Sequence, residues 1–177
     1  MSSPISLELA DHQAALLAAF GEVAENSLFA FADASSEAAF DEAARTTADA
    51  WLHAGIRFSG PVGGRLEMVA PATLIRRLCA AFAGAPSPDD IRDCDLFDFA
   101  GELTNMVCGT WLTRTWQHES FSLTPPRVLH GPDRDLAVRP DSVSPRTVYL
   151  AIDDTPIRLE LEWDDAVPAA RERIDGR

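Results

Sequence analysis

Clustered positive charge is missing from this sequence. Its 177 residues carry 15 Lys and Arg against 28 Asp and Glu, which gives a formal net charge of −13 at pH 7. Nucleic acids and anionic membranes attract proteins mainly through clustered basic residues. We therefore expect neither a nucleic acid nor a membrane as a partner.

Long apolar runs are also missing. No stretch approaches the ~20 apolar residues that a membrane-spanning helix needs. The first residues, Met1-Ser2-Ser3-Pro4, have neither the basic region nor the apolar core of a secretion signal. We therefore expect a cytoplasmic protein.

Cysteine and histidine, the usual residues of metal sites, are scarce. Cys79, Cys94 and Cys108 are widely spaced and lie within helical apolar patterns, which predicts buried, reduced thiols and no disulfide. The histidines lie on different expected elements without the spacing of metal ligands: His12, His53, His118 and His130. We expect the chain to bind no metal and no cofactor of its own.

The clearest pattern that is present is a long helical period over residues 89–116, a stretch without proline. Asp98, Glu102 and Asn105 stand at i, i+4 and i+7, which places them on one stripe of a helix, and Gly109 follows one turn later. The opposite arc is apolar: Leu96, Phe99, Ala100, Leu103, Val107 and Trp111. The stripe alone fits either a functional site or an ordinary solvated face.

The residues of this stripe resemble the active-site helix of the CheX/CheC family of chemotaxis phosphatases. The resemblance rests on Asp98, Glu102, Asn105, Met106, Val107 and Gly109, and on a strand that begins at Pro126. It implies an α+β fold of the CheC type, a pseudo-twofold domain in which a mainly antiparallel sheet packs with long helices. It also implies that the chain removes phosphate from the aspartyl phosphate of a CheY-like response regulator.

The resemblance gives each residue of the stripe a role. Asn105 would position the attacking water, because a carboxamide can accept a hydrogen bond from water and donate another to a phosphoryl oxygen. Glu102 would pair with the active-site lysine of the partner. Asp98 and Gly109 would bind the partner, Asp98 through a polar contact and Gly109 by keeping the helix surface low. The Mg²⁺ ion would belong to the partner's receiver domain.

Two other functions fit parts of the pattern. A non-catalytic adaptor or binding module of a two-component or flagellar-switch pathway has the same fold without using this asparagine, and the presence of Glu102 and Asn105 together favours the phosphatase. An unrelated small-molecule enzyme using Glu102 would need a closed pocket, which the sequence does not indicate.

Trp116 fits either a partner contact or a packing role, and an edge strand could pair in a homodimer.

A second helical pattern covers Leu7 to Phe31 and contains an echo of the first. The segment from Gly21 to Glu25 repeats the pattern of Gly101 to Asn105, which suggests an internal duplication. Glu25 stands where the asparagine would be, and Ala18 stands where Asp98 has its counterpart. We therefore expect one active helix and one copy without a site.

The rest of the chain predicts short helices and antiparallel strands within a single domain over residues 1–177. Two short helices are expected at 37–45 and 72–83, and the long helix is expected to open at Ser87-Pro88-Asp89-Asp90. Strands are expected at 52–58, 65–70, 121–131, 147–152 and 156–163. Trp51, Trp111 and Trp163 are expected in the core, Pro132–Pro145 as an exposed loop, and Val167–Arg177 as a loose tail.

Overall fold

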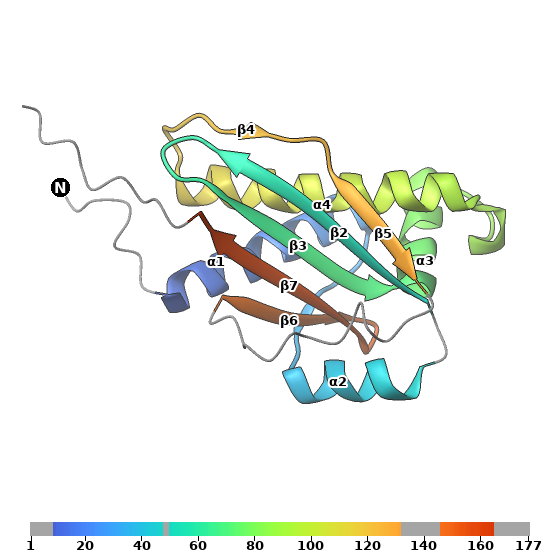
Figure 1. Cartoon of the computed structure of the whole chain (residues 1–177). Coiled ribbons are helices and arrows are strands. Elements are labelled where there is room, and N and C mark those ends of the chain that lie inside the picture. Colours follow the sequence, from blue (N-terminus) through green and yellow to red (C-terminus); the bar gives the residue numbers. More distant parts are fainter. Residues whose placement is uncertain (1–8, 48–49, 132–145, 165–177) are drawn as a thin grey trace, which may run out of the picture.

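The computed structural model describes residues 9–47, 50–131 and 146–164 (Figure 1). The expected loop at Pro132–Pro145 and the expected tail at Val167–Arg177 lie outside these residues. The helical elements are α1 (Leu9–Val23), η2 (Ala24–Leu28), α2 (Glu37–Thr46), α3 (Ala72–Ala83), η3 (Pro88–Asp90) and α4 (Asp93–Thr115). The strands are β1 (Asp33–Ala34), β2 (Trp51–Ser59), β3 (Gly64–Pro71), β4 (Ser122–Leu123), β5 (Arg127–Gly131), β6 (Thr147–Ile152) and β7 (Thr155–Trp163).

The described strands form one sheet in which every pair is antiparallel. The order is β1-β6-β7-β3-β2, and the far side of β2 pairs with both β4 and β5. The predicted α+β class with a mainly antiparallel sheet is therefore confirmed. Because β5 and β4 pair only with β2, they form one edge of the sheet beside α4 (Figure 1).

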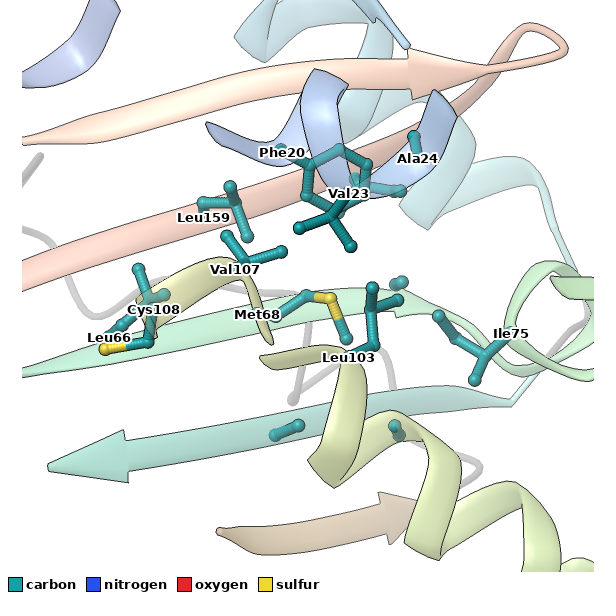
Figure 2. Close-up of a cluster of buried hydrophobic side chains, with 14 of the residues drawn as sticks. Phe20, Val23, Ala24, Leu66, Met68, Ile75, Leu103, Val107, Cys108 and Leu159 are labelled. Atoms are coloured by element: carbon teal, nitrogen blue, oxygen red, sulfur yellow. The ribbon is translucent and has the colours of Figure 1, made fainter. Parts of the chain in front are cut away.

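One face of the sheet carries most of the core. Alternate residues of β2, β3, β6 and β7 point to this face, as the period of two predicts, and pack against α1, α3 and α4. Figure 2 shows part of this layer, with Phe20 and Val23 of α1 and Leu103 and Val107 of α4 gathered around Met68 of β3. The long helices α1 and α4 are thus held side by side on the sheet (Figure 1).

The opposite face is covered only in part, by α2. Phe40 and Ala44 of α2 pack with Trp51 of β2, Val69 of β3 and the partly buried Tyr149 of β6. These strand residues belong to the face that points away from α1 and α4. The remainder of this face is not covered by a described helix.

An aromatic cluster closes one end of the layer between the helices and the sheet. The His12 ring stacks on Trp116 with a centroid distance of 5.8 Å and meets the edge of Trp163 at 5.3 Å. Trp111 lies 5.3 Å from Trp116 and 5.7 Å from Trp163. Trp116 is 5% exposed, so its packing role is the one that the structure supports.

The first helix is shorter than the prediction of Leu7 to Phe31. After α1 the chain makes one turn of π-helix, η2, and Phe29 then takes a left-handed conformation with φ of 53°. This conformation ends the helix, because a left-handed residue breaks the helical hydrogen-bond pattern. Phe31 is 75% exposed, so the prediction that it belongs to the apolar face of this helix was wrong. The short strand β1 follows, which the sequence did not predict.

The single strand predicted over residues 121–131 is two strands instead. Pro125 and Pro126 separate β4 from β5, because proline has no N–H to donate to a strand ladder. The hairpin of β6 and β7 is confirmed, but β7 begins at Thr155, one residue earlier than predicted, so the turn consists of Asp153 and Asp154 alone. Asp153 and Asp154 have φ of 47° and 61°, and positive φ at both positions is what this type of tight turn requires.

Candidate functional site on helix α4

The polar stripe that the sequence predicts lies on the outward side of α4. Asp98 and Glu102 are exposed, and Asn105 and Gly109 are partly buried. The apolar arc lies against the sheet, and all six of its predicted members are buried: Leu96, Phe99, Ala100, Leu103, Val107 and Trp111. The structure thus brings Glu102, Asn105 and Gly109 onto one accessible surface.

Asn105 and Glu102 are connected directly. The Asn105 Nδ2 donates a hydrogen bond to Glu102 Oε2 at 3.4 Å, across one helical turn. Within the part of the chain that the structure describes, the Asn105 carboxamide oxygen receives no hydrogen bond. The carboxamide therefore keeps its acceptor oxygen unused, and the Glu102 carboxylate keeps one oxygen without a protein partner in the same described part.

Gly101 lets the edge of the sheet approach this surface closely. A Cβ atom at Gly101 would lie 2.8 Å from Pro126 Cγ and 3.6 Å from Val128 Cγ2, so only glycine fits without a shift. Pro126 directly precedes β5, and it packs against Gly101, the residue before Glu102. The contact fixes the height of α4 over the sheet at the site. Sequence reasoning identified Pro126 but not the role of Gly101. A glycine within a predicted helix, next to its apolar arc, was the signal that could have revealed this close contact.

Gly109 has the opposite surroundings. A Cβ atom added there would meet nothing within 4 Å. Packing among the described residues therefore does not require glycine at position 109. Because Gly109 has no side chain, the helix surface is shallower there, one turn beyond Asn105. This geometry agrees with the predicted partner-binding role without testing it.

The amino-terminal end of α4 is fixed differently from the prediction. Ser87 caps η3, through a hydrogen bond from Asp89 N to Ser87 Oγ at 3.2 Å, and not α4. The chain then becomes extended at Ile91, whose buried side chain enters the core, and α4 begins only at Asp93. Arg76 of α3 holds this junction by donating to the Ile91 carbonyl and pairing with Asp93 at 2.6 Å.

The echo segment in α1 is engaged in a contact that the sequence did not reveal. Glu22, the counterpart of Glu102, pairs with Arg114 of α4, with Arg114 Nη1 at 2.5 Å from Glu22 Oε2. Glu25, the counterpart of Asn105, lies in the π-helical turn η2. The two residues are thus not arranged as Glu102 and Asn105 are.

The thiols are only partly as predicted. Cys79 and Cys108 are buried, and burial raises the pKa of the Cys108 thiol to about 12. Cys94 is exposed, so the prediction of three buried thiols was wrong at this residue. Cys94 stands on the first turn of α4, between Asp93 and Asp95, and its side chain is open to solvent. All three thiols are free.

Other classes of site find little support among the described residues. Across residues 9–47, 50–131 and 146–164, no group of three or more His, Cys, Asp or Glu side chains is placed to hold a metal ion. In that same part of the chain, no helix combines the length and the apolar character needed to cross a bilayer.

The fold and the stripe on α4 define an α+β protein of the CheC-like class, and comparisons with solved structures agree. The chemotaxis protein CheX of Desulfovibrio desulfuricans superposes with a TM-score of 0.62 at 16% identity, over 89% of this chain and 100% of that chain. CheX of Vibrio vulnificus gives 0.61 at 15% identity, over 90% and 100%. The CheX–CheY–BeF3–Mg²⁺ complex of Borrelia burgdorferi gives 0.55 at 14% identity, over 88% and 99%. At these identities the likeness shows the fold.

The family itself follows from the sequence. Residues 52–148, more than half of the chain, match the family described as Chemotaxis phosphatase CheX. The chain therefore belongs to the CheX family. No curated protein sequence matches it at a significant level. The matched segment includes α4 with Glu102 and Asn105, and also Pro126.

Proposed function

We propose that this chain is a phosphatase that removes phosphate from the aspartyl phosphate of a CheY-like receiver domain. Two observations support this function: the chain belongs to the CheX family, and one structural relative has been solved as a complex of CheX with CheY, BeF3 and Mg²⁺. The observation that carries the proposal is the Asn105 carboxamide, held from one side by Glu102 on an exposed stripe.

In this mechanism the chain contributes geometry. Asn105 accepts a hydrogen bond from the attacking water and aligns it with the phosphorus for in-line displacement. Fixing the water in this way removes much of the orientational cost of the reaction. The carboxamide is not a base at neutral pH, so the proton leaves the water through groups of the partner. The Mg²⁺ ion, held by the partner, neutralises charge on the phosphoryl group.

Docking is the task of the neighbouring residues. Glu102 pairs with the partner's active-site lysine, and its hydrogen bond to Asn105 then sets the carboxamide relative to the phosphoryl group. Asp98 adds a polar contact one turn towards the helix start. Gly109 leaves room for the partner's backbone to approach the surface. Each role is a proposal for these positions, and each has a separate substitution that tests it.

The test is the rate at which a purified phosphorylated receiver domain loses phosphate, measured at saturating concentrations of this protein. We expect the wild type to accelerate the loss and Asn105→Ala to abolish the acceleration while still binding. Asn26→Ala is the matched control, because Asn26 is the other asparagine of the chain and is exposed on η2. It should behave as the wild type.

One result would contradict the phosphatase, and another would contradict the role of Asn105. A receiver that binds in a phosphorylation-dependent way but loses phosphate no faster would support the adaptor instead. Acceleration that survives Asn105→Ala would show that another group positions the water.

A further inference from the structure

A hollow lies on the opposite face of the sheet from Glu102 and Asn105, beside the area that α2 covers. It has a volume of about 540 Å³, within the ~300–1,000 Å³ range of small-molecule sites. Its lining comes from three adjacent strands and the segment before β5: His53, Gly55, Ile56, Arg57, Arg65, Glu67, Thr124, Pro125, Arg127 and Leu129. The hollow is thus formed entirely by residues that the catalytic proposal does not use.

Gly55 forms the floor of the hollow. The strand register places Gly55 opposite Arg127 on β5 and opposite Glu67 on β3, so two long side chains flank a position that has none. A Cβ atom at Gly55 would meet the Glu67 side chain at 3.6 Å, an ordinary contact. The space above Gly55 is therefore available to a larger side chain or to a ligand.

One wall of the hollow is apolar and open. Pro125 and Leu129 line it from the edge of the sheet, and Leu129 is 59% exposed. Leu129 is one of the few large apolar side chains that the described fold leaves so accessible. A ligand with an apolar body would remove this surface from water.

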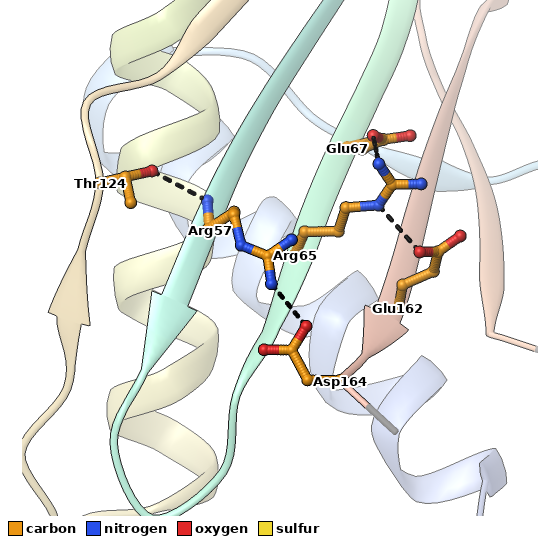
Figure 3. Close-up of polar contacts among 6 residues, drawn as sticks. All are labelled: Arg57, Arg65, Glu67, Thr124, Glu162 and Asp164. Carbon is orange, nitrogen blue, oxygen red and sulfur yellow. Dashed lines mark hydrogen bonds and ion pairs between the residues drawn. The ribbon is translucent and has the colours of Figure 1, made fainter. Parts of the chain in front are cut away.

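Ion pairs engage some of the charges around the hollow, and Figure 3 shows those of Arg57 and Arg65, including the pair of Arg65 with Glu67 at 3.1 Å. Arg57 and Arg65 are cross-strand partners, an unfavourable pairing of like charges. Each turns to a carboxylate near the end of β7: Arg57 pairs with Asp164 at 2.5 Å, and Arg65 pairs with Glu162 at 2.9 Å. Among the residues that the structure describes, Arg127 makes no ion pair. One guanidinium at the edge of the hollow is therefore uncompensated in an acidic chain.

The remaining polar groups complete the site. The Thr124 hydroxyl oxygen accepts a hydrogen bond from Arg57 N at 3.2 Å, which leaves the hydroxyl proton available as a donor. On the other side, His53 lies 3.2 Å from Glu67, and this hydrogen bond holds the pKa of Glu67 below its usual value. The side near Arg127 and Thr124 thus offers donors, whereas the carboxylate on the far side is already engaged.

We propose that this hollow binds a small organic anion. Its carboxylate or phosphate group is held by the guanidinium of Arg127 and by the Thr124 hydroxyl. Its apolar body lies over Gly55 against Pro125 and Leu129. A guanidinium binds either kind of anion in a bidentate manner, so the anionic group defines the class of ligand and not its source.

The test uses benzoate and phenyl phosphate as probes. Inorganic phosphate is the control that lacks the apolar body, and benzamide is the control that lacks the charge. Backbone amide chemical shifts of the full chain are followed during each titration. For ligands of this size we expect dissociation constants on the order of 1 mM for the two organic anions. Inorganic phosphate and benzamide should bind at least about tenfold more weakly.

Two variants locate the site. Arg127→Ala removes the uncompensated charge and should weaken both organic anions about tenfold or more. Gly55→Val fills the floor and should abolish binding, and the Cβ atom it adds makes only an ordinary contact at 3.6 Å. Arg45→Ala is the control for loss of one arginine, because Arg45 is exposed on α2 and, among the described residues, pairs with Glu42 alone. Thermal melts confirm that each variant is folded.

The proposal is overturned if neither organic anion gives a saturable shift at residues of the hollow, or if Arg127→Ala and Gly55→Val bind as the wild type does. Equal affinity for inorganic phosphate would overturn the role of the apolar wall. None of these results depends on phosphatase activity, so the two proposals succeed or fail separately.

Discussion

Helices α1 and α4 carry a similar short pattern on the same layer of the protein, yet the surroundings of its glycine, its glutamate and its last residue differ. In α4, Gly101 is buried, and an added Cβ would lie 2.8 Å from Pro126. In α1, Gly21 has nothing within 4 Å of an added Cβ. The glycine of α4 is therefore required by a strand behind it, and the glycine of α1 is not.

The acidic residues differ in the same sense. Glu102 receives a hydrogen bond from Asn105 on its own helix, whereas Glu22 is paired with Arg114 from the other helix. The following residues differ in backbone as well, because α4 continues as a regular helix through Asn105 and α1 passes into the π-helical turn η2. The two helices thus differ in the support around them as well as in the residues on them.

Exchanging residues between the two helices is the sharpest way to break this comparison. Asn105→Glu gives α4 the residue that α1 has at position 25, and it should reduce dephosphorylation by about a hundredfold or more, because the positioned water is lost. The reverse change, Glu25→Asn with Ala18→Asp in an Asn105→Ala background, should restore nothing. The rate of phosphate loss from the receiver measures both. Recovery of more than a small fraction of the activity would show that the pattern alone suffices.

The two glycines should respond to alanine in opposite directions. Gly101→Ala forces Pro126 to move and should cost about 1–3 kcal/mol of unfolding free energy. Gly21→Ala meets no neighbour and should stabilise the protein by about 0.5–1 kcal/mol through its higher helix propensity. Urea unfolding followed by circular dichroism measures both changes. Equal effects at the two positions would mean that the contact with Pro126 relaxes freely.

The two glutamates should differ in partner binding. Glu102→Gln removes the charge that is proposed to pair with the partner's lysine, and it should weaken the complex a few-fold, about 1 kcal/mol or less, and less so in high salt. Glu22→Gln should change the affinity by less than about twofold, since Glu22 is already paired within the chain. Titration of a labelled receiver domain at two salt concentrations gives both values. A larger loss at Glu22 would assign α1 to the docking surface.

The smallest effect is expected at the pair between the two helices. Arg114 and Glu22 are each nearly half exposed, so solvent screens their attraction. Arg114→Ala should lower the unfolding free energy by no more than about 1 kcal/mol and leave dephosphorylation unchanged. Urea unfolding and the phosphate-loss assay test this. A large loss of activity would show that the ion pair between Arg114 and Glu22 helps to position α4.

Sequence periodicity predicted those parts of the molecule that are regular and local. The stripe and the buried arc of α4 follow from one helical period that runs without interruption, and the β6–β7 hairpin follows from alternation around Asp153 and Asp154. The family resemblance added Pro126, and the structure places this proline against Gly101 of the helix.

The features that the sequence did not reveal depend on backbone irregularity or on partners far along the chain. The turn of π-helix and the left-handed Phe29 interrupt a period that continues in the sequence as far as Phe31. The pair between Arg114 and Glu22 joins residues 92 positions apart. The hollow depends on the register between β2, β3 and β5, which alternation within one strand does not determine.

The positions of the four tryptophans give the protein two separate optical signals. Trp111, Trp116 and Trp163 lie 5.3–5.8 Å apart, close enough for their excited states to couple, so they should dominate the near-ultraviolet circular dichroism. Trp51 lies on the other face of the sheet, beneath α2. A Trp51→Phe variant would therefore emit only from the cluster around His12, where α1 meets α4. Its fluorescence would follow the docking of those two helices without any added label.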